Sequence, residues 1–288
     1  MPEGDTIFRT ARTLERALHG AVVRRFFSAL AEPGRADDER PFSGQRVVRV
    51  ESRGKWLLMV FGKEDQDEAA ERVLATHMLM SGSWHVYGPA AKWQKPREQA
   101  RIVVETDTYT AAGFRIPIAK VYSWEKLRRE RKIPRVEEDL LRVEFDLEAA
   151  VKRLMARGVE SVGEAIVNQR VMAGVGNVFK SEVCFAERVS PFARVSDLSE
   201  AQVRGLVEQA RRQLQANVLE DSGDRVVTYQ GRKRRTTHNT DPGANVWVYG
   251  RRGEACRRCG AGIERALQGD GARVTYWCPD CQPVLREA

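Results

Sequence analysis

The spacing of apolar residues predicts a helix at the start of the chain. Between residues 5 and 20 the apolar positions recur with a helical period, at Ile7, Ala11, Leu14 and Leu18. Asp5 or Thr6 can cap such a helix, and Gly20 can end it. Pro2 and Glu3 would then lie just before a helix N-terminus, where the helix dipole favours a carboxylate and an anionic ligand.

From about residue 21 to 125 the spacing changes to short runs that are typical of β-strands. These runs cover residues 45–50, 56–61, 73–77, 83–87 and 101–105. Polar stretches with turn residues separate several of them, at 32–40, 62–72 and 88–98. The pattern predicts an antiparallel sandwich or barrel.

Helical spacing returns in the second half of the chain. The expected helices cover 147–157, 161 to about 169, 177 to about 187, and 199 to about 219. Ser161 with Glu164, and Ser199 with Gln202, have the spacing of a capping box. The charged stretch 124–135 is interpreted as the linker between the β-rich and helical parts, although a solvated helix face would have the same composition.

The composition of the chain limits which classes of protein and which partners fit it. The 288 residues are 42% hydrophobic with a net charge of +8, and the isoelectric point is about 9.4. Such a chain can form two domains with real cores, and its basic charge suits nucleic acid before an anionic membrane surface. No apolar run approaches the ~20 residues that span a bilayer. The N-terminus also lacks an apolar signal segment, so we expect a cytosolic protein with no membrane partner. A bacterial source and a monomeric state are further expectations.

Four of the five cysteines form the pattern C-x2-C-x18-C-x2-C: Cys256, Cys259, Cys278 and Cys281. In a reducing compartment this spacing favours metal over disulfides, and four thiolates can surround one structural Zn²⁺ ion. A redox-active or coincidental C-x-x-C pair is the alternative. Cys184 lies in an apolar helical stretch and is expected to be buried. Arg273 follows the turn of a predicted hairpin between the pairs and could contact a phosphate.

The first residues carry candidate chemistry. Removal of Met1 before Pro2 would leave a secondary amine, and an α-amino group has a pKa of ~8. Such an amine can attack a sugar carbon and form a Schiff base, with Glu3 moving the proton. Proline at position 2 is also common in cytosolic proteins that have no such activity.

Four further positions are candidates with an ordinary structural alternative. Lys55 could be catalytic, or solvated at a strand entrance. His77 could be functional or structural. Met80 could pack in a core or insert into a base stack. The turn 174–177 has two glycines that allow a phosphate to approach, but it could be a plain turn with Asn177 as N-cap.

Taken in order, these motifs resemble the formamidopyrimidine-DNA glycosylase/endonuclease VIII family. The resemblance covers nearly the whole chain. It is carried by Pro2-Glu3-Gly4, Ser52-Arg53-Gly54-Lys55, His77 through Gly82, Asn168-Gln169-Arg170 running to Asn177, and the four-cysteine finger with Arg273. The Pro-Glu-Gly start is more similar to the endonuclease VIII branch than to the formamidopyrimidine branch.

The resemblance implies an α+β fold with three domains. Residues 1–133 would form a catalytic β-sandwich with flanking helices, residues 134–242 a helix–two-turns–helix DNA-binding domain, and residues 243–288 a β-hairpin zinc finger. Segment 221–242 would belong to a lesion-recognition loop. One structural zinc ion is the implied cofactor.

The resemblance also implies a bifunctional DNA glycosylase and abasic-site lyase of base excision repair. Pro2 would attack the sugar carbon of a flipped-out nucleotide, Glu3 would protonate the ring oxygen, and Lys55 would contact a nearby phosphate. Asn177 and Arg273 would hold phosphates of damaged duplex DNA, with His77 and Met80 also at the DNA. Single-stranded or bubble DNA is the alternative substrate form.

Two departures from the family pattern leave alternatives open. Thr6 stands where endonuclease VIII proteins often have a second glutamate. Residues 111–117 do not supply a clear Arg-x-Phe wedge, which leaves Met80 as the void-filling candidate. We expect oxidised pyrimidines as substrates from the branch resemblance. Oxidised purines, a non-catalytic damaged-DNA binder and a zinc-ribbon interaction protein are the alternatives.

Overall fold

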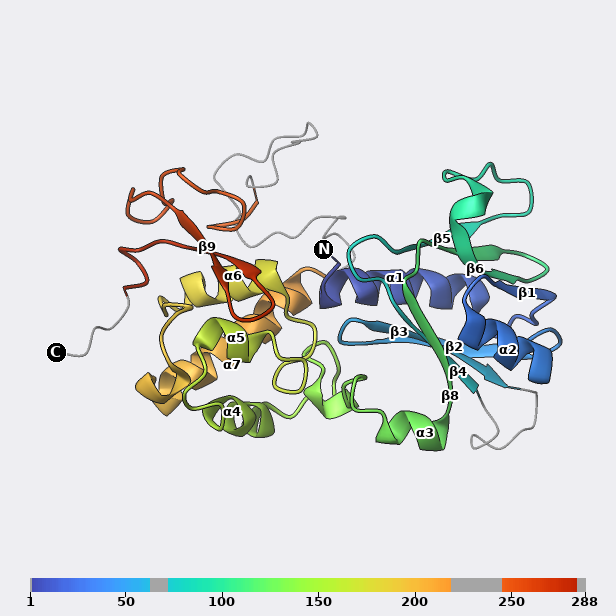
Figure 1. Ribbon diagram of the computed structural model, residues 1–288, viewed down its shortest axis with the longest axis horizontal. Coiled ribbons are helices and arrows are strands. Elements are labelled where there is room, and N and C mark those ends of the chain that lie inside the picture. Colours follow the sequence, from blue (N-terminus) through green and yellow to red (C-terminus); the bar gives the residue numbers. More distant parts are fainter. Residues whose placement is uncertain (1, 63–71, 219–244, 284–288) are drawn as a thin grey trace. The chain divides into compact units, whose positions relative to one another are not determined.

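The computed structural model describes residues 2–62, 72–218 and 245–283, which form two compact units, Met1–Arg135 and Val136–Ala288 (Figure 1). The predicted lesion-recognition segment 221–242 lies outside the described residues. Within the described residues, every helix is too short or too polar to cross a membrane. The predicted boundaries at 133/134 and 242/243 remain predictions.

The first unit contains two four-stranded antiparallel sheets, as predicted for a sandwich. One sheet has the order β2-β3-β4-β8, with β2 (Arg46–Arg53), β3 (Trp56–Gly62), β4 (Arg72–His77) and β8 (Ile118–Ser123). The other has the order β1-β6-β7-β5, with β1 (Arg25–Ser28), β6 (Ala100–Glu105), β7 (Thr110–Phe114) and β5 (Ser83–Tyr87). The helix α1 (Gly4–Leu18) packs against β2, β3 and β5 (Figure 1).

Burial on both faces explains the apolar run of β3, in which all seven residues are buried. Leu57, Met59 and Phe61 join a core shared by α1 and both sheets. Leu58 and Val60 face a second core, which includes residues of α3 (Trp124–Arg129). A strand that is covered on both faces loses its alternation of polar and apolar residues.

Two helices lie where the sequence was interpreted as turn or linker. The turn interpretation was wrong, whereas a helix over the first half of 124–135 agrees with the alternative stated for that stretch. The helix α2 (Ala31–Glu39) occupies the stretch predicted as polar turn, although Pro33 is its one buried residue. The helix α3 occupies the start of the predicted linker. Ser123 caps α3 by accepting a hydrogen bond from the Lys126 amide, and Leu127 is buried. Short polar helices of this kind depend on tertiary contacts more than on periodicity.

The second unit is helical, with a small hairpin after it. Its elements are α4 (Leu147–Met155), α5 (Val162–Ile166), α6 (Asn177–Ala186), α7 (Glu200–Ala216), β9 (Glu264–Gln268) and β10 (Arg273–Trp277). The capping box at Ser199 and Gln202 is confirmed. At Ser161 it is wrong, because the hydroxyl donates to the Glu164 carboxylate at 2.5 Å and caps no backbone group.

Candidate functional site

The N-terminal residues lie at the beginning of α1. Pro2 is half-buried, and Glu3 is the N-cap of the helix with 1% of its surface exposed. The predicted cap at Asp5 or Thr6 is wrong, since both residues lie inside the first turn. The helix terminus therefore places a buried carboxylate beside the residue that would carry the amine.

Asp5 is a buried carboxylate that the sequence suggested only as a cap. It is 0% exposed and pairs with Arg9 at 3.1 Å, one helical turn later. Burial raises the pKa of Asp5 above its ordinary value, and the charge of Arg9 opposes that rise.

Lys55 lies in the tight turn between β2 and β3. Arg53 pairs with Trp56, so the connection consists of Gly54 and Lys55, and Gly54 has a φ of +56°. Glycine at the first position of a two-residue hairpin loop allows this conformation. Lys55 is only 7% exposed, so the alternative of a solvated lysine is wrong.

His77 is the last residue of β4 and pairs with Trp56 across the strands. Their rings are perpendicular with centroids 5.1 Å apart. The amide of Leu79 donates to Nδ1 of His77 at 3.1 Å, which requires that this nitrogen carry no proton. Burial, followed by the charge of Lys55, lowers the pKa of His77 from 6.5 to about 4. The structure thus brings Lys55 together with a neutral imidazole.

The pKa of His77 predicts how stability depends on pH. Because the folded-state pKa of about 4 lies below the ordinary 6.5, the folded protein binds fewer protons in that interval than the unfolded chain. Stability is therefore present above pH 6.5 and is lost as the pH falls toward 4. We expect His77→Gln to reduce the acid-side fall in melting temperature across this window. An unchanged pH profile in His77→Gln would contradict this assignment.

Met80 occupies the tip of the loop between β4 and β5. It is 79% exposed, and its neighbour Leu79 is 44% exposed with a φ of +46°. The loop is closed by a bond from the Gly82 amide to the Met78 carbonyl at 2.8 Å. A Cβ at Gly82 would meet that same oxygen at 2.7 Å, so the loop requires glycine. Core packing is excluded for Met80, which is presented to solvent as an apolar side chain.

The region 111–117 supplies no exposed aromatic wedge. Phe114 is 0% exposed and belongs to a cluster with Tyr87 and Ala112. Arg115 is exposed with a φ of +49°. The absence of a clear wedge in the sequence thus agrees with the burial of the phenylalanine.

The turn between α5 and α6 is held by Gln169. Its side-chain amide donates to the carbonyls of Val167 and Val175 at 2.8 and 3.0 Å and accepts from the Gly174 amide at 3.0 Å. Gly174 has a φ of +106°, which a larger residue would rarely adopt. These bonds fix the turn that leads to the N-terminus of α6.

Asn177 is the first residue of α6 and is not its cap, so the alternative of a capping role is wrong. The N-cap is Gly176. Oδ1 of Asn177 is buried and has no hydrogen-bond partner among the described residues. The backbone N–H groups at this helix N-terminus are suited to a phosphate, and the group of Asn177 that would donate to it is Nδ2, since Oδ1 is an acceptor.

The four predicted cysteines come together. Their Sγ atoms lie within 4.8 Å of one another, with 3.4 Å between Cys259 and Cys278 and 3.9 Å between Cys256 and Cys281. Tetrahedral coordination with ~2.3 Å Zn–S bonds corresponds to sulfur separations of roughly 3.8 Å. The arrangement fits one metal ion. Arg273 is exposed at the start of β10, next to the hairpin turn.

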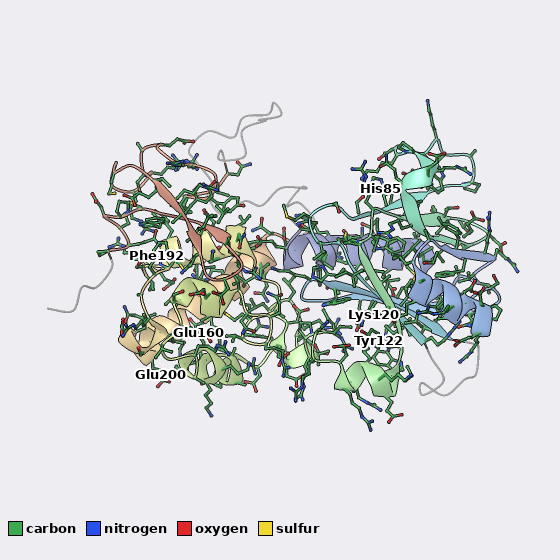
Figure 2. All side chains as sticks on the ribbon, viewed as in Figure 1. His85, Lys120, Tyr122, Glu160, Phe192 and Glu200 are labelled. Atoms are coloured by element: carbon green, nitrogen blue, oxygen red, sulfur yellow. The ribbon has the colours of Figure 1, made fainter. Side chains whose placement is uncertain are left out.

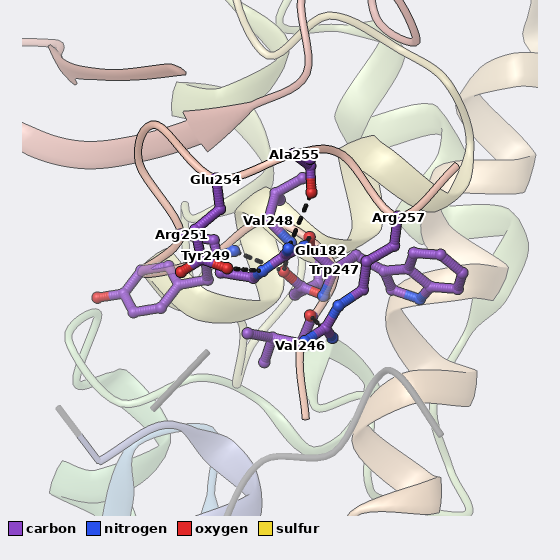
Figure 3. A network of polar contacts seen from close by, with 9 residues as sticks. All are labelled: Glu182, Val246, Trp247, Val248, Tyr249, Arg251, Glu254, Ala255 and Arg257. Carbon is purple, nitrogen blue, oxygen red and sulfur yellow. Dashed lines mark hydrogen bonds and ion pairs between the residues drawn. The ribbon is translucent and has the colours of Figure 1, made fainter. Parts of the chain in front are cut away.

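The cysteine module is attached to α6 through Glu182, whose role the sequence did not reveal. This fully buried carboxylate accepts the amides of Trp247, Val248 and Tyr249 at 2.7, 2.9 and 2.9 Å (Figure 3). Arg251 donates to the Trp247 and Ala255 carbonyls. These partners lie about 65 residues from Glu182 in sequence, a separation that no local pattern indicates.

A second connection runs through buried polar side chains. Lys180, which is 0% exposed, donates to Oγ1 of Thr275 at 2.6 Å. Thr275 donates to Oε1 of Gln268, and Gln268 donates to Oγ of Ser161. This last bond explains why Ser161 does not cap α5. The helical elements and the hairpin of the second unit are therefore joined by a satisfied hydrogen-bond network.

Two family models match the chain. The formamidopyrimidine-DNA glycosylase N-terminal domain matches residues 1–116, and the H2TH domain of the same family matches residues 137–228. The "Probable endonuclease 8 2" of Streptomyces coelicolor is 36% identical over 98% of this chain and 94% of that protein. The "DNA-(apurinic or apyrimidinic site) lyase Nei2" of Mycolicibacterium smegmatis is 34% identical over 98% and 99%.

More distant relatives and solved structures agree in fold. A formamidopyrimidine-DNA glycosylase of Corynebacterium aurimucosum is 28% identical over 94% of this chain and 93% of that protein. The Lactococcus lactis formamidopyrimidine-DNA glycosylase, solved with DNA containing an abasic site, superposes with a TM-score of 0.75 at 19% identity, covering 98% and 99% of the two chains.

Proposed function

The chain belongs to the formamidopyrimidine-DNA glycosylase/endonuclease VIII family and is a DNA glycosylase and abasic-site lyase of base excision repair, and we propose that it excises oxidised pyrimidines through the amine of Pro2. The observation that carries this proposal is the start of α1. There Pro2 precedes a helix N-terminus and Glu3, the N-cap, is buried beside it. Removal of Met1 would present a secondary amine next to a carboxylate.

The first step forms one bond and breaks another. The lone pair of the Pro2 nitrogen attacks the anomeric carbon of the damaged nucleotide, and the bond from that carbon to the base breaks. The base leaves with the electron pair, and it takes up a proton while the Pro2 nitrogen loses its own. Glu3 donates a proton to the sugar ring oxygen, so that the ring opens and the carbon–nitrogen bond becomes an iminium.

The iminium then acts as the electron sink for strand cleavage. Loss of a proton from the neighbouring sugar carbon expels the 3′ phosphate, and a second elimination expels the 5′ phosphate. Lys55 is proposed to hold one of these phosphates, because it is cationic and fixed in a tight hairpin turn. His77 remains neutral beside it and is proposed to contact the DNA without adding charge. Water finally hydrolyses the imine and releases Pro2.

Damaged duplex DNA is the proposed partner. Asn177 and the N-terminus of α6 are proposed to hold one phosphate, and the exposed Arg273 another. The exposed Met80 is proposed to fill the space left by the flipped nucleotide. Phosphate contacts are independent of sequence, which suits an enzyme that must find damage anywhere.

Zinc is the proposed metal of the cysteine cluster. Four thiolates complete a tetrahedral site and leave no position for a reacting water. Bound zinc would therefore stabilise the fold of the module that carries Arg273. Cys256, Cys259, Cys278 and Cys281 would be the ligands.

Oxidised pyrimidines are proposed as the preferred lesions for two reasons. The relatives with the higher identities above carry the names endonuclease 8 and abasic-site lyase. The start Pro2-Glu3-Gly4 also resembles the endonuclease VIII branch of the family. We also propose that the protein is a monomer in the bacterial cytosol. Oxidised purines remain the alternative substrate class that the experiment must include.

Borohydride trapping on a duplex with one abasic site tests the chemistry, with intact mass read on the same protein. We expect a covalent adduct on protein that lacks Met1, and cleavage of a thymine glycol duplex faster than of an 8-oxoguanine duplex. Faster excision of 8-oxoguanine would overturn the pyrimidine assignment. Absence of any adduct from correctly processed protein would overturn the proposed role of Pro2 and favour a damaged-DNA binder.

A further inference from the structure

A second polar pocket lies in the first unit, at the end of β4 and β8 opposite to Lys55 and His77. Arg72 begins β4 and pairs with Ser123 at the end of β8, whereas His77 ends β4 and pairs with Ile118. Five steps along a strand correspond to about 17 Å. The pocket is therefore separate from the candidate catalytic residues.

The pocket has a volume of about 450 Å³, which is within the range of small-molecule sites. Among its described lining residues, four are cations and two are carboxylates: Arg35, Arg40, Arg72, Lys126, Glu32 and Glu39. A neighbouring hollow shares Tyr122 and Lys126 and adds Arg129 and Arg131. Positive charge from α2, β4 and α3 thus converges on one concave surface.

Arg72 is the residue that most requires a partner. Its Nη1 donates to the Ala36 carbonyl at 2.9 Å, and its guanidinium lies 3.9 Å from the centre of the Phe42 ring. Nε and Nη2 are buried without a hydrogen-bond partner among the described residues. Orphaned buried donors are unfavourable, and a phosphate in the pocket would satisfy them after a rotation of the Arg72 side chain, because both nitrogens are covered in this conformation.

Electrostatics at Arg72 agree with this geometry. Burial, and then the like charge of Arg40, lower the pKa of Arg72 from its ordinary value to about 10, with Asp37 opposing the change. Two guanidinium groups that repel one another in a partly enclosed site are stabilised by an anion between them.

We propose that this pocket binds the phosphate of a nucleotide-sized phosphate ester. Arg72, Arg40 and Lys126 would contact the phosphate oxygens, since guanidinium groups match phosphate geometry. Glu32 and Glu39 would accept hydrogen bonds from sugar hydroxyls. Tyr122, labelled beside α3 in Figure 2, forms an aromatic wall, and its hydroxyl donates to Glu130 at 3.0 Å. The phosphate could belong to a free nucleotide or to the end of a nucleic-acid strand.

Calorimetric titration with ADP, at an ionic strength of ~0.15 M, tests the proposal. We expect ADP to bind, and adenosine, which has no phosphate, not to bind. Lys126→Ala and Arg40→Ala should each weaken ADP binding about tenfold, the effect of losing one charged hydrogen bond. Both residues are exposed, so neither substitution should unfold the protein.

Arg128→Ala is the matched control, because Arg128 is an exposed cation on the same helix that is absent from the described lining of the pocket. It should leave ADP binding unchanged, and all three variants should keep wild-type cleavage of abasic DNA. Competition of ADP by a 5′-phosphorylated oligonucleotide, but not by its unphosphorylated form, would identify a strand end as the source. Without such competition, the source is the free nucleotide.

The proposal is overturned if ADP gives no binding heat, if adenosine binds as tightly as ADP, or if Arg128→Ala weakens binding as much as Lys126→Ala. Because the readout is nucleotide binding, the result is independent of lesion excision. A failure of the Pro2 chemistry would therefore leave this test unaffected.

Discussion

Pro2→Ala is expected to abolish strand cleavage at an abasic site while the protein still binds the same duplex. The rate should fall about 10³-fold, because the substitution replaces the secondary amine of Pro2 with the primary amine of an alanine. The reason is chemical. A secondary amine forms an iminium that keeps its positive charge at every pH, whereas the imine of a primary amine loses its charge by deprotonation and withdraws electrons less strongly.

DNA binding should survive because Pro2 is a single residue before α1. The proposed phosphate contacts lie elsewhere, at Lys55, Asn177 and Arg273. The measurement combines borohydride trapping, cleavage rates and a gel shift on one duplex at a stated salt concentration. Intact mass must show that Met1 is absent from both proteins.

Pro96→Ala provides the matched control, since it makes the same substitution at an exposed loop proline in the same unit. It should trap and cleave as the wild type does. A variant with one glycine inserted before Pro2 should behave like Pro2→Ala, because the amine is displaced from Glu3. Wild-type trapping by Pro2→Ala, or an equal loss of DNA binding, would contradict the assigned role.

The parts that the sequence predicted well are those in which local pattern and structure coincide. The face of α1 formed by Ile7, Ala11, Leu14 and Leu18 is buried as expected. The capping box at Ser199 forms because no competing partner reaches its hydroxyl among the described residues. The four cysteines of the C-x2-C pairs have their Sγ atoms within 4.8 Å of one another, which suits one metal ion. In each case the interacting residues are close in sequence or, like the cysteines, are of a type with few possible partners.

The parts that the sequence could not predict depend on contacts between distant segments. Lys55 looks like a solvated turn lysine until the hairpin is packed, and then it is 7% exposed. Ser161 has the spacing of a cap, but Gln268, 107 residues away, occupies its hydroxyl. Glu182 resembles an ordinary helical glutamate and instead binds three amides about 65 residues later. Tertiary partners of this kind leave no periodic signal.

Cys259→Ser is expected to remove bound zinc and, with it, most of the DNA affinity. Structural zinc contributes apparent binding energies of about 10–16 kcal/mol to small metal modules at neutral pH. Losing one thiolate from a closed four-ligand site should therefore unfold the module locally. The hairpin that carries Arg273 depends on that module, because β9 and β10 follow the first cysteine pair and precede the second.

The hydrogen bonds between α6 and the following segments of the second unit determine how far this unfolding should spread. Glu182 holds residues 247–249 and Lys180 holds Thr275, and both side chains come from α6. Loss of the hairpin would remove the Thr275 partner of the buried Lys180, which is unfavourable, whereas the partners of Glu182 lie outside the hairpin. We therefore expect a lower melting temperature for the second unit, while the sandwich, which shares none of these bonds, keeps its own transition.

Cys184→Ala is the control, because Cys184 is a buried cysteine of α6 that lies outside the four-thiol cluster. It should lose some stability through the missing sulfur atom but retain one zinc per chain and wild-type DNA binding. Zinc content by mass spectrometry, calorimetry and a gel shift distinguish the two variants. Full zinc content and unchanged DNA binding in Cys259→Ser would show that these thiols do not form the site. Loss of zinc with unchanged DNA binding would show that Arg273 does not hold the DNA.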